Sequence, residues 1–181
     1  MPDWLAAGEA DALYQQLHDE TPWEDLVLRV AGRLVAMPRR VAYCGPHAYA
    51  YSGLIHEPRA VTPAIEAIRR RIEAAAGHPF NTVLMNLYRS GADSVSWHSD
   101  DDYPHGGHPA VASLSLGATR RFRIAGKRDA SARYSVELTS GGLLLMEGRS
   151  QLDYRHALPK STVVNGPRIN LTFRFMAASN T

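Results

Sequence analysis

The sequence predicts one α+β domain with a β-sandwich or an open barrel at its centre. Helical periodicity is confined to the first half of the chain, and after Phe80 short apolar runs alternate with clusters of Gly, Pro, Asp and Ser. The length of 181 residues suits one hydrophobic core and is short for two. We therefore treat residues 1–181 as a single domain.

The composition limits the class of protein. Hydrophobic residues make up 45% of the chain, which excludes general disorder, and 20 basic against 18 acidic residues give no whole-chain signal for nucleic acid. The single cysteine, Cys44, favours a packing role over a reactive thiol and indicates a reducing compartment. The N-terminus lacks the basic segment of a secretory signal, and no apolar run is long enough to cross a bilayer. We expect a cytoplasmic monomer without membrane contact.

The N-terminal half contains two predicted helices and a hairpin. Residues Gly8–Leu17 have the pattern of a short helix, and the apolar runs Leu26–Val30 and Arg33–Met37 flank an Ala-Gly turn. A second helix begins where Thr62 can cap and Pro63 suits the first position. Isoleucines follow at helical spacing, and the helix ends at Gly77.

The C-terminal half is predicted to form successive strands, because turn residues cluster between its apolar runs. The predicted strands are Thr82–Tyr88, Ala110–Leu116, Arg121–Ile124, Tyr134–Leu138, Leu143–Glu147 and Arg168–Phe175.

The last of these strands alternates strictly between apolar and polar residues, which face opposite sides. The apolar residues, expected to be buried, are Ile169, Leu171, Phe173 and Phe175, and the polar ones are Arg168, Asn170, Thr172 and Arg174. The polar side either faces solvent or, with Asn86 and Tyr88 of the first strand, lines a site for a small acidic ligand. Two arginines suit a dicarboxylate, although roughly 20 Å of strand separates them, so both must lean inward.

A metal site is indicated by His98 and Asp100, which point the same way in an extended chain. A second histidine would complete a facial triad of two histidines and one carboxylate, which leaves positions open for a co-substrate and O₂. The candidates are His105, His108 and His156. The first two lie in a Gly- and Pro-rich loop, whereas His156 lies between two predicted strands and nearest to the arginines, so it is favoured.

A zinc hydrolase could also use two histidines and an aspartate. Such an enzyme has no need of a strand with two arginines. The arginine strand therefore favours iron with 2-oxoglutarate over zinc with water.

Taken in order, these motifs resemble the signature of the AlkB-type dioxygenases. The resemblance runs from about Leu26 to Phe175 and is greatest for the branch that contains human AlkB homologue 2 and similar bacterial proteins. It is carried by Asn86-Leu87-Tyr88, His98-Ser99-Asp100, His156, Arg168-Ile169-Asn170-Leu171-Thr172-Phe173-Arg174, Ala112–Ala118 and Leu158-Pro159-Lys160.

The resemblance implies a double-stranded β-helix (jelly roll) over about residues 80–176, N-terminal helices and a nucleotide-recognition lid of hairpins over about residues 20–60. It implies Fe(II) as the metal, with 2-oxoglutarate and O₂ as co-substrates. The implied iron ligands are His98, Asp100 and His156. Arg174 would pair with the distal carboxylate of 2-oxoglutarate, and the rest of that molecule would be held by Arg168, Asn86, Tyr88 and Asn170.

The implied activity is oxidative dealkylation of N-alkylated bases in single- or double-stranded DNA, with release of succinate, CO₂ and an aldehyde. Bases of the 1-methyladenine and 3-methylcytosine type are the expected substrates, with etheno adducts as a further class. Methylated RNA or protein is an alternative substrate. A non-catalytic damage-binding module is disfavoured, because the ligand set and both arginines are intact.

The resemblance also implies residues that hold a flipped base. Tyr51 would stack on the base with His98, and Tyr49 would form a hydrogen bond nearby. Ser52 would also contact the substrate, and Asp102 would bind the exocyclic amine of the base. Without the resemblance, the tyrosines would be ordinary core or surface residues and Asp102 a solvated acid. Candidate cations for phosphates are Arg29, Arg33, Arg39, Arg40, Arg120, Arg121, Arg123, Lys127 and Arg128.

One lid segment departs from the resembling human homologue. That protein carries a bulky aromatic that wedges into the duplex, whereas here the matching stretch is Val30-Ala31-Gly32, with alanine at the wedge position. A methyl group buries little surface and cannot stack, so we expect a preference for unpaired lesions. The alternative is that Val30, Leu34 or Met37 supplies the wedge, or that lid arginines bend the duplex.

Overall fold

The computed structural model describes residues 1–30, 32–51, 54–100, 110–129 and 131–177. The helices are α1 (Ala7–Glu20), α2 (Pro63–Ala76) and α3 (Ser150–Asp153). The strands are β1 (Glu24–Val30), β2 (Arg33–Cys44), β3 (Tyr49–Tyr51), β4 (Leu54–His56), β5 (Thr82–Tyr88), β6 (Val95–His98), β7 (Val111–Gly117), β8 (Arg120–Gly126), β9 (Arg133–Leu138), β10 (Leu143–Met146), β11 (Tyr154–Leu158) and β12 (Arg168–Arg174).

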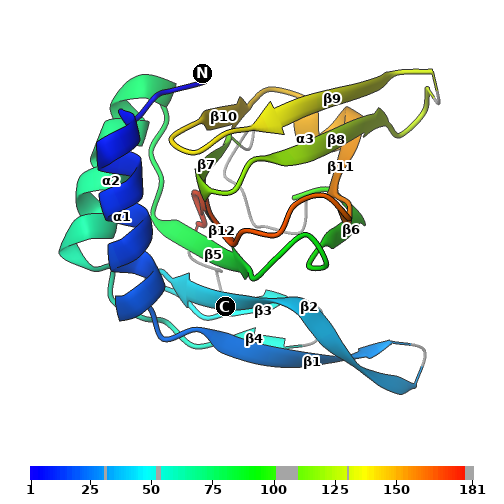
Figure 1. The fold of residues 1–181 in the computed structure, drawn as a ribbon, viewed down its shortest axis with the longest axis horizontal. Helices are drawn as coiled ribbons and strands as arrows, with labels where there is room; N and C mark the ends of the chain where they lie inside the picture. The colour runs from blue at the N-terminus through cyan, green and yellow to red at the C-terminus, as the bar shows by residue number, and fades with distance from the viewer. Residues whose placement is uncertain (31, 52–53, 101–109, 130, 178–181) are drawn as a thin grey trace.

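Two antiparallel sheets form the centre of the molecule. One has the strand order β1-β2-β5-β12-β7-β10 and the other β6-β11-β8-β9, while β3 and β4 form a separate pair. Apolar side chains from both large sheets meet in one cluster, for example Tyr88 and Val111 from the six-stranded sheet and Phe122 and Leu158 from the four-stranded one. Figure 1 shows α1 and α2 on the side away from the four-stranded sheet. The expected α+β fold with a jelly-roll core is confirmed.

Both N-terminal helices are confirmed. The α2 helix starts with the Thr62 hydroxyl accepting from the Ile65 amide at 3.4 Å, and it ends at Gly77, whose φ of 69° is left-handed. Its buried isoleucines, like Leu13 and Leu17 of α1, pack in the main core cluster. The α1 helix extends beyond the predicted Gly8–Leu17 at both ends.

Strand β12 is buried on both faces, which decides between the two interpretations of its polar side. Ile169, Leu171 and Phe173 are fully buried in the core next to the helices, while the polar residues, at most 8% exposed, face the space between the sheets. The solvent alternative is therefore wrong. The expectation for Phe175 is also wrong: β12 ends at Arg174, and Phe175 is 41% exposed.

The predicted hairpin is confirmed, with Val30 paired to Arg33 across the turn and Gly32 at a φ of 79°. The ends of β1 and β2 that meet at this turn point away from α1 and α2 (Figure 1). Strand β2 continues to Cys44 and pairs with β5, so the hairpin is continuous with the six-stranded sheet. Cys44 is buried in the main core, as its predicted packing role requires, and burial raises the pKa of its thiol. Among the described residues, no helix has both the length and the apolar character needed to cross a membrane.

Candidate metal and co-substrate site

A cavity of about 50 Å³ lies between the two sheets. Its walls include all of the metal and co-substrate residues expected from the sequence, and further side chains from both sheets. The lining residues are Arg39, Leu84, Asn86, Tyr88, Val95, His98, Asp100, Phe122, Met146, His156, Leu158, Arg168, Asn170, Thr172 and Arg174.

The three expected metal ligands converge at one end of the cavity. His98 and His156 are direct cross-strand partners on β6 and β11, and Asp100 follows β6 by two residues. The nearest Asp100 oxygens lie 4.0 Å from His98 Nε2 and 3.7 Å from His156 Nε2. One possible ligand atom from each of the three residues lies within 4.8 Å of the other two, which is close enough for all three to bind a single ion. Two imidazoles and one carboxylate form the donor set of a non-haem Fe(II) site with open positions.

Local hydrogen bonds orient these ligands. The His98 Nδ1 lies 2.8 Å from the Ser96 carbonyl oxygen, to which it donates when protonated, and this leaves Nε2 free for a metal. The Asp100 amide donates to Gln151 Oε1 at 2.9 Å, and the fully buried Gln151 fixes the turn after β6. Phe122 stacks on His156 at a centroid distance of 5.2 Å.

Arg174 is a direct partner of a candidate metal ligand. Its Nη2 donates to Asp100 Oδ1 at 2.6 Å, and both side chains are buried. Burial alone would raise the pKa of Asp100, but the positive charge of Arg174, followed by those of the two histidines, outweighs it and holds this pKa below the usual value. Asp100 is therefore ready to bind a cation as a carboxylate.

His105 and His108, the alternative second histidines, lie outside the described residues. Within the described parts of the chain, His98, Asp100 and His156 are the group of His, Cys, Asp or Glu side chains that could hold a metal.

The other end of the cavity holds a buried cation. Arg168 is 2% exposed, its Nη2 donates to Ser115 Oγ at 2.8 Å, and its guanidinium lies over the Tyr88 ring at 5.3 Å. Burial lowers the pKa of Arg168 to about 10. Its Nε is buried and has no hydrogen-bond partner among the described residues, which also place no carboxylate in an ion pair with it. A buried cation with an unused donor fits an anionic ligand, as 2-oxoglutarate requires.

Arg39 orients the amide of Asn86. Its Nε donates to Asn86 Oδ1 at 2.7 Å, and its Nη1 donates to the Ser94 carbonyl at 3.3 Å. The Asn86 oxygen thereby accepts a hydrogen bond already, so its NH₂ group is the part available to donate to a carboxylate in the cavity. The sequence suggested Arg39 as a phosphate contact. At 5% exposure, Arg39 cannot serve that role and acts within the site instead.

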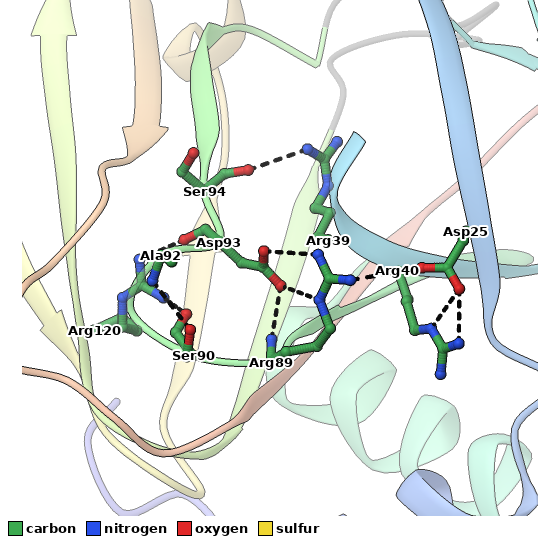
Figure 2. A network of polar contacts seen from close by, with 9 residues as sticks. All are labelled: Asp25, Arg39, Arg40, Arg89, Ser90, Ala92, Asp93, Ser94 and Arg120. Atoms are coloured by element: carbon green, nitrogen blue, oxygen red, sulfur yellow. Dashed lines mark hydrogen bonds and ion pairs between the residues drawn. The ribbon is translucent and has the colours of Figure 1, made fainter. Parts of the chain in front are cut away.

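The loop between β5 and β6 is held by a further network (Figure 2). The carboxylate of buried Asp93 accepts from the Arg89 amide and guanidinium, while Arg120 donates to the backbone carbonyls of Ser90, Asp93 and Pro159. Arg120 was also a candidate phosphate contact. It is 2% exposed and donates to three backbone carbonyls, so that interpretation is wrong.

The expected base-binding residues are only partly described. Tyr49 and Tyr51 lie on β3, paired with His56 and Leu54 of β4, which places them in one short hairpin. Ser52 and Asp102, like Ala31 of the lid turn, lie outside the described residues. The roles suggested for these five residues stay predictions.

The buried histidine leads to a pH prediction for the metal-free protein. Burial, followed by the nearby His98, lowers the pKa of His156 to about 4, below the ordinary 6.5. Between these values the unfolded chain binds more protons than the folded one, so stability falls as the pH drops from about 6.5 to about 4. The loss attributable to His156 is about 3 kcal/mol. Urea unfolding across this range should show it, and His156→Asn should flatten the curve; an unchanged slope would contradict the assignment.

Comparisons with known proteins agree with this geometry. A family model described as the 2OG-Fe(II) oxygenase superfamily matches residues 1–174. Human "alpha-ketoglutarate-dependent dioxygenase alkB homolog 3" is 38% identical over 96% of this chain, and human "DNA oxidative demethylase ALKBH2" is 34% identical over 92%. The motif resemblance pointed to the latter branch, and the homolog 3 protein is somewhat more identical.

The extent of these matches differs between relatives. This chain spans 64% of the length of human alkB homolog 3 and 69% of human ALKBH2. The solved structure titled "The structure of OsALKBH1" aligns with 96% of this chain and 95% of its own, at a TM-score of 0.65 and 18% identity, which supports the fold.

Proposed function

Because this chain belongs to the 2OG-Fe(II) oxygenase superfamily, and within it to the AlkB-type proteins, we propose that it removes alkyl groups oxidatively from N-alkylated bases of nucleic acid. The observation that carries the proposal is the pairing of a His-Asp-His cluster with a buried arginine that has an unused donor, at two ends of one cavity. Fe(II), 2-oxoglutarate and O₂ are the corresponding cofactor and co-substrates.

The chain's own residues divide the work of binding. His98, Asp100 and His156 would hold the iron, which with 2-oxoglutarate and O₂ supplies the oxidising chemistry. We assign the two arginines differently from the sequence expectation. Arg174 donates to the candidate ligand Asp100, so it lies at the metal end, whereas Arg168 lies over the Tyr88 ring toward the other end of the cavity. Arg168 therefore suits the distal carboxylate, and Arg174 steadies Asp100.

The remaining co-substrate residues have two kinds of role. The Asn86 NH₂, set by Arg39, and the Tyr88 ring under Arg168 face the cavity and would contact 2-oxoglutarate. Asn170 already donates to Ser113 Oγ and to the Leu114 carbonyl, and its oxygen accepts from Thr172. We place it as a support for β12 rather than a direct contact.

For the substrate, DNA is favoured because one relative is named a DNA oxidative demethylase. Tyr49, Tyr51, Ser52 and Asp102 are proposed to hold the flipped base. The alternatives of RNA or protein substrates, the lid over about residues 20–60, the core over about residues 80–176, the cytoplasmic location and the monomeric state stay predictions.

A substrate panel tests the proposal. Oligonucleotides of DNA and RNA that carry 1-methyladenine, 3-methylcytosine or an etheno base are incubated with the protein, iron and 2-oxoglutarate. Release of the aldehyde and recovery of the unmodified base are measured together with succinate. Binding of the oligonucleotide without succinate formation would instead support a non-catalytic damage-binding module.

The hairpin tip leads to a prediction on duplex substrates. Leu34 is 69% exposed near the turn and could act as a wedge, whereas Met37 is buried and cannot. With alanine at position 31, wild type should repair an unpaired lesion faster than a paired one, and Ala31→Phe should narrow the gap mainly by faster duplex repair. The comparison uses one methylated base in single-stranded, mismatched and paired contexts, with Leu34→Ala as the companion variant. Equal repair rates of wild type in all three contexts would contradict the expected preference for unpaired lesions.

A further inference from the structure

We infer that the outer face of the four-stranded sheet is a second contact surface, one that binds the backbone and bases of single-stranded nucleic acid outside the cavity. This inference extends the proposed nucleic-acid substrate and rests on it. The outer face consists of the side chains that point away from the cavity on β6, β11, β8 and β9. In Figure 1 this sheet lies on the side of the molecule away from α1 and α2.

Strand alternation places basic residues on this face. Phe122, Ile124 and His156 point inward, so their neighbours Arg121, Arg123 and Arg155 point outward and are exposed. Cross-strand pairing forms one row of Arg155, Ala125 and Arg133 and a second row of Ala157, Arg123 and Ser135. The face thus holds rows of arginine separated by small residues.

The charge of this face differs from that of the whole chain. The charged residues on it are Arg121, Arg123, Arg133, Arg155 and Glu137. Four arginines against one glutamate contrast with 20 basic against 18 acidic residues overall. Arg121 forms an ion pair with Glu137 at 2.8 Å, whereas Arg123 has no ion-pair partner among the described residues. Such a local excess of arginine is what a phosphate backbone requires.

An exposed aromatic on the same face supplies a second, independent observation. Trp97 is 43% exposed, and the Arg155 guanidinium lies 5.3 Å from the centre of its ring. An exposed indole with a guanidinium over its ring is a platform on which an unpaired base can stack, and proteins that bind single strands combine such platforms with cationic grooves.

The same face continues into a hollow of about 210 Å³ between β8 and the segment that follows β11. Arg121, Arg123 and Lys160 are among its lining residues, and Lys160 is exposed. Strand β6 is the edge of its sheet, so a strand of nucleic acid could pass from the cavity around this edge, over Trp97 and Arg155, toward the hollow. Only an oligomer long enough to turn the edge would make these contacts.

The test measures binding of undamaged single-stranded DNA by fluorescence anisotropy, without 2-oxoglutarate, using oligomers of about 4 and about 16 nucleotides. The double variant Arg123→Gln/Arg155→Gln should weaken binding of the longer oligomer and reduce the slope of log K against log salt by about 1.4, or about 0.7 per lost phosphate contact. Trp97→Ala should weaken it at least about fivefold, with Trp97→Phe closer to wild type. Binding of the shorter oligomer should change little in each case.

The matched control is Arg70→Gln, which removes a charge from α2 at a side chain 73% exposed. Thermal unfolding of each variant checks that it is folded. The proposed contact surface would be contradicted if the double variant kept the wild-type affinity and salt slope, or if Arg70→Gln lost as much affinity for the longer oligomer. Because binding is measured without turnover, a failure of the dealkylation assay leaves this result interpretable.

Discussion

His98→Ala is expected to abolish iron binding and with it the 2-oxoglutarate turnover, while the protein stays folded. Three side chains would hold the metal, and losing one would leave the ion without a fixed geometry. His98 is the cleanest position to change, because its side chain is 29% exposed, compared with 7% for His156 and for Asp100. Iron content after dialysis and succinate formation are the two measurements.

Asp100→Ala should have the same effect on iron and a second effect on folding. It removes the carboxylate partner of buried Arg174, and losing one member of a buried pair costs about 3–5 kcal/mol of unfolding free energy. His98→Ala should lack this loss. His78→Ala, at an exposed histidine 3.5 Å from Glu147, is the control for both. Full turnover in His98→Ala would mean that His98 is not a metal ligand, and His105 and His108 would be the next candidates.

Arg168→Met is expected to raise the concentration of 2-oxoglutarate needed for turnover by at least about 30-fold, since truncating one partner of a buried charged pair costs about 2 kcal/mol or more. Arg168→Lys should recover only part, because an ammonium cannot provide the forked pair of donors. Thermal unfolding gives a readout independent of turnover. Wild type should be stabilised by 2-oxoglutarate and Arg168→Met should not.

In the absence of 2-oxoglutarate, Arg168→Met is not expected to be less stable than wild type. Arg168 is a buried cation with no described carboxylate partner, so replacing it with a similarly long apolar side chain should leave the ligand-free protein as stable or more stable. The comparison variant is Arg174→Met, which breaks the bond to Asp100 and should destabilise. If 2-oxoglutarate stabilised Arg168→Met against thermal unfolding as much as wild type, Arg174 would be the better candidate for binding the distal carboxylate.

Much of this arrangement could be predicted from the sequence where periodicity or capping was strong. The Thr62-Pro63 start and Gly77 end of α2, the bounds of β5 and the alternation of β12 all have local physical causes. The proximity of the candidate ligands His98 and Asp100 was also predicted, because their spacing places them on one side of an extended chain. These features depend on neighbours in sequence.

The features that were missed depend on distant partners. Strands β6 and β11 are short and carry polar residues, and they are extended because they pair with each other and, for β11, with β8. The hydrogen bond from Arg174 to Asp100, on which the proposed roles of the two arginines rest, joins residues 74 positions apart in the sequence. Arg39 and Arg120 looked like surface cations because burial of an arginine depends on acceptors elsewhere in the chain.

The direct pairing of His98 with His156 across β6 and β11 ties metal uptake to correct strand alignment. A slip of one residue would turn His156 to the outer side of the sheet and bring Arg155 or Ala157 inward, so the misaligned chain would present only one of the two imidazoles. Iron would then bind the correctly aligned form selectively and draw the population toward it by mass action. In the proposed site the bound ion would therefore stabilise the correct strand alignment in addition to supporting the reaction.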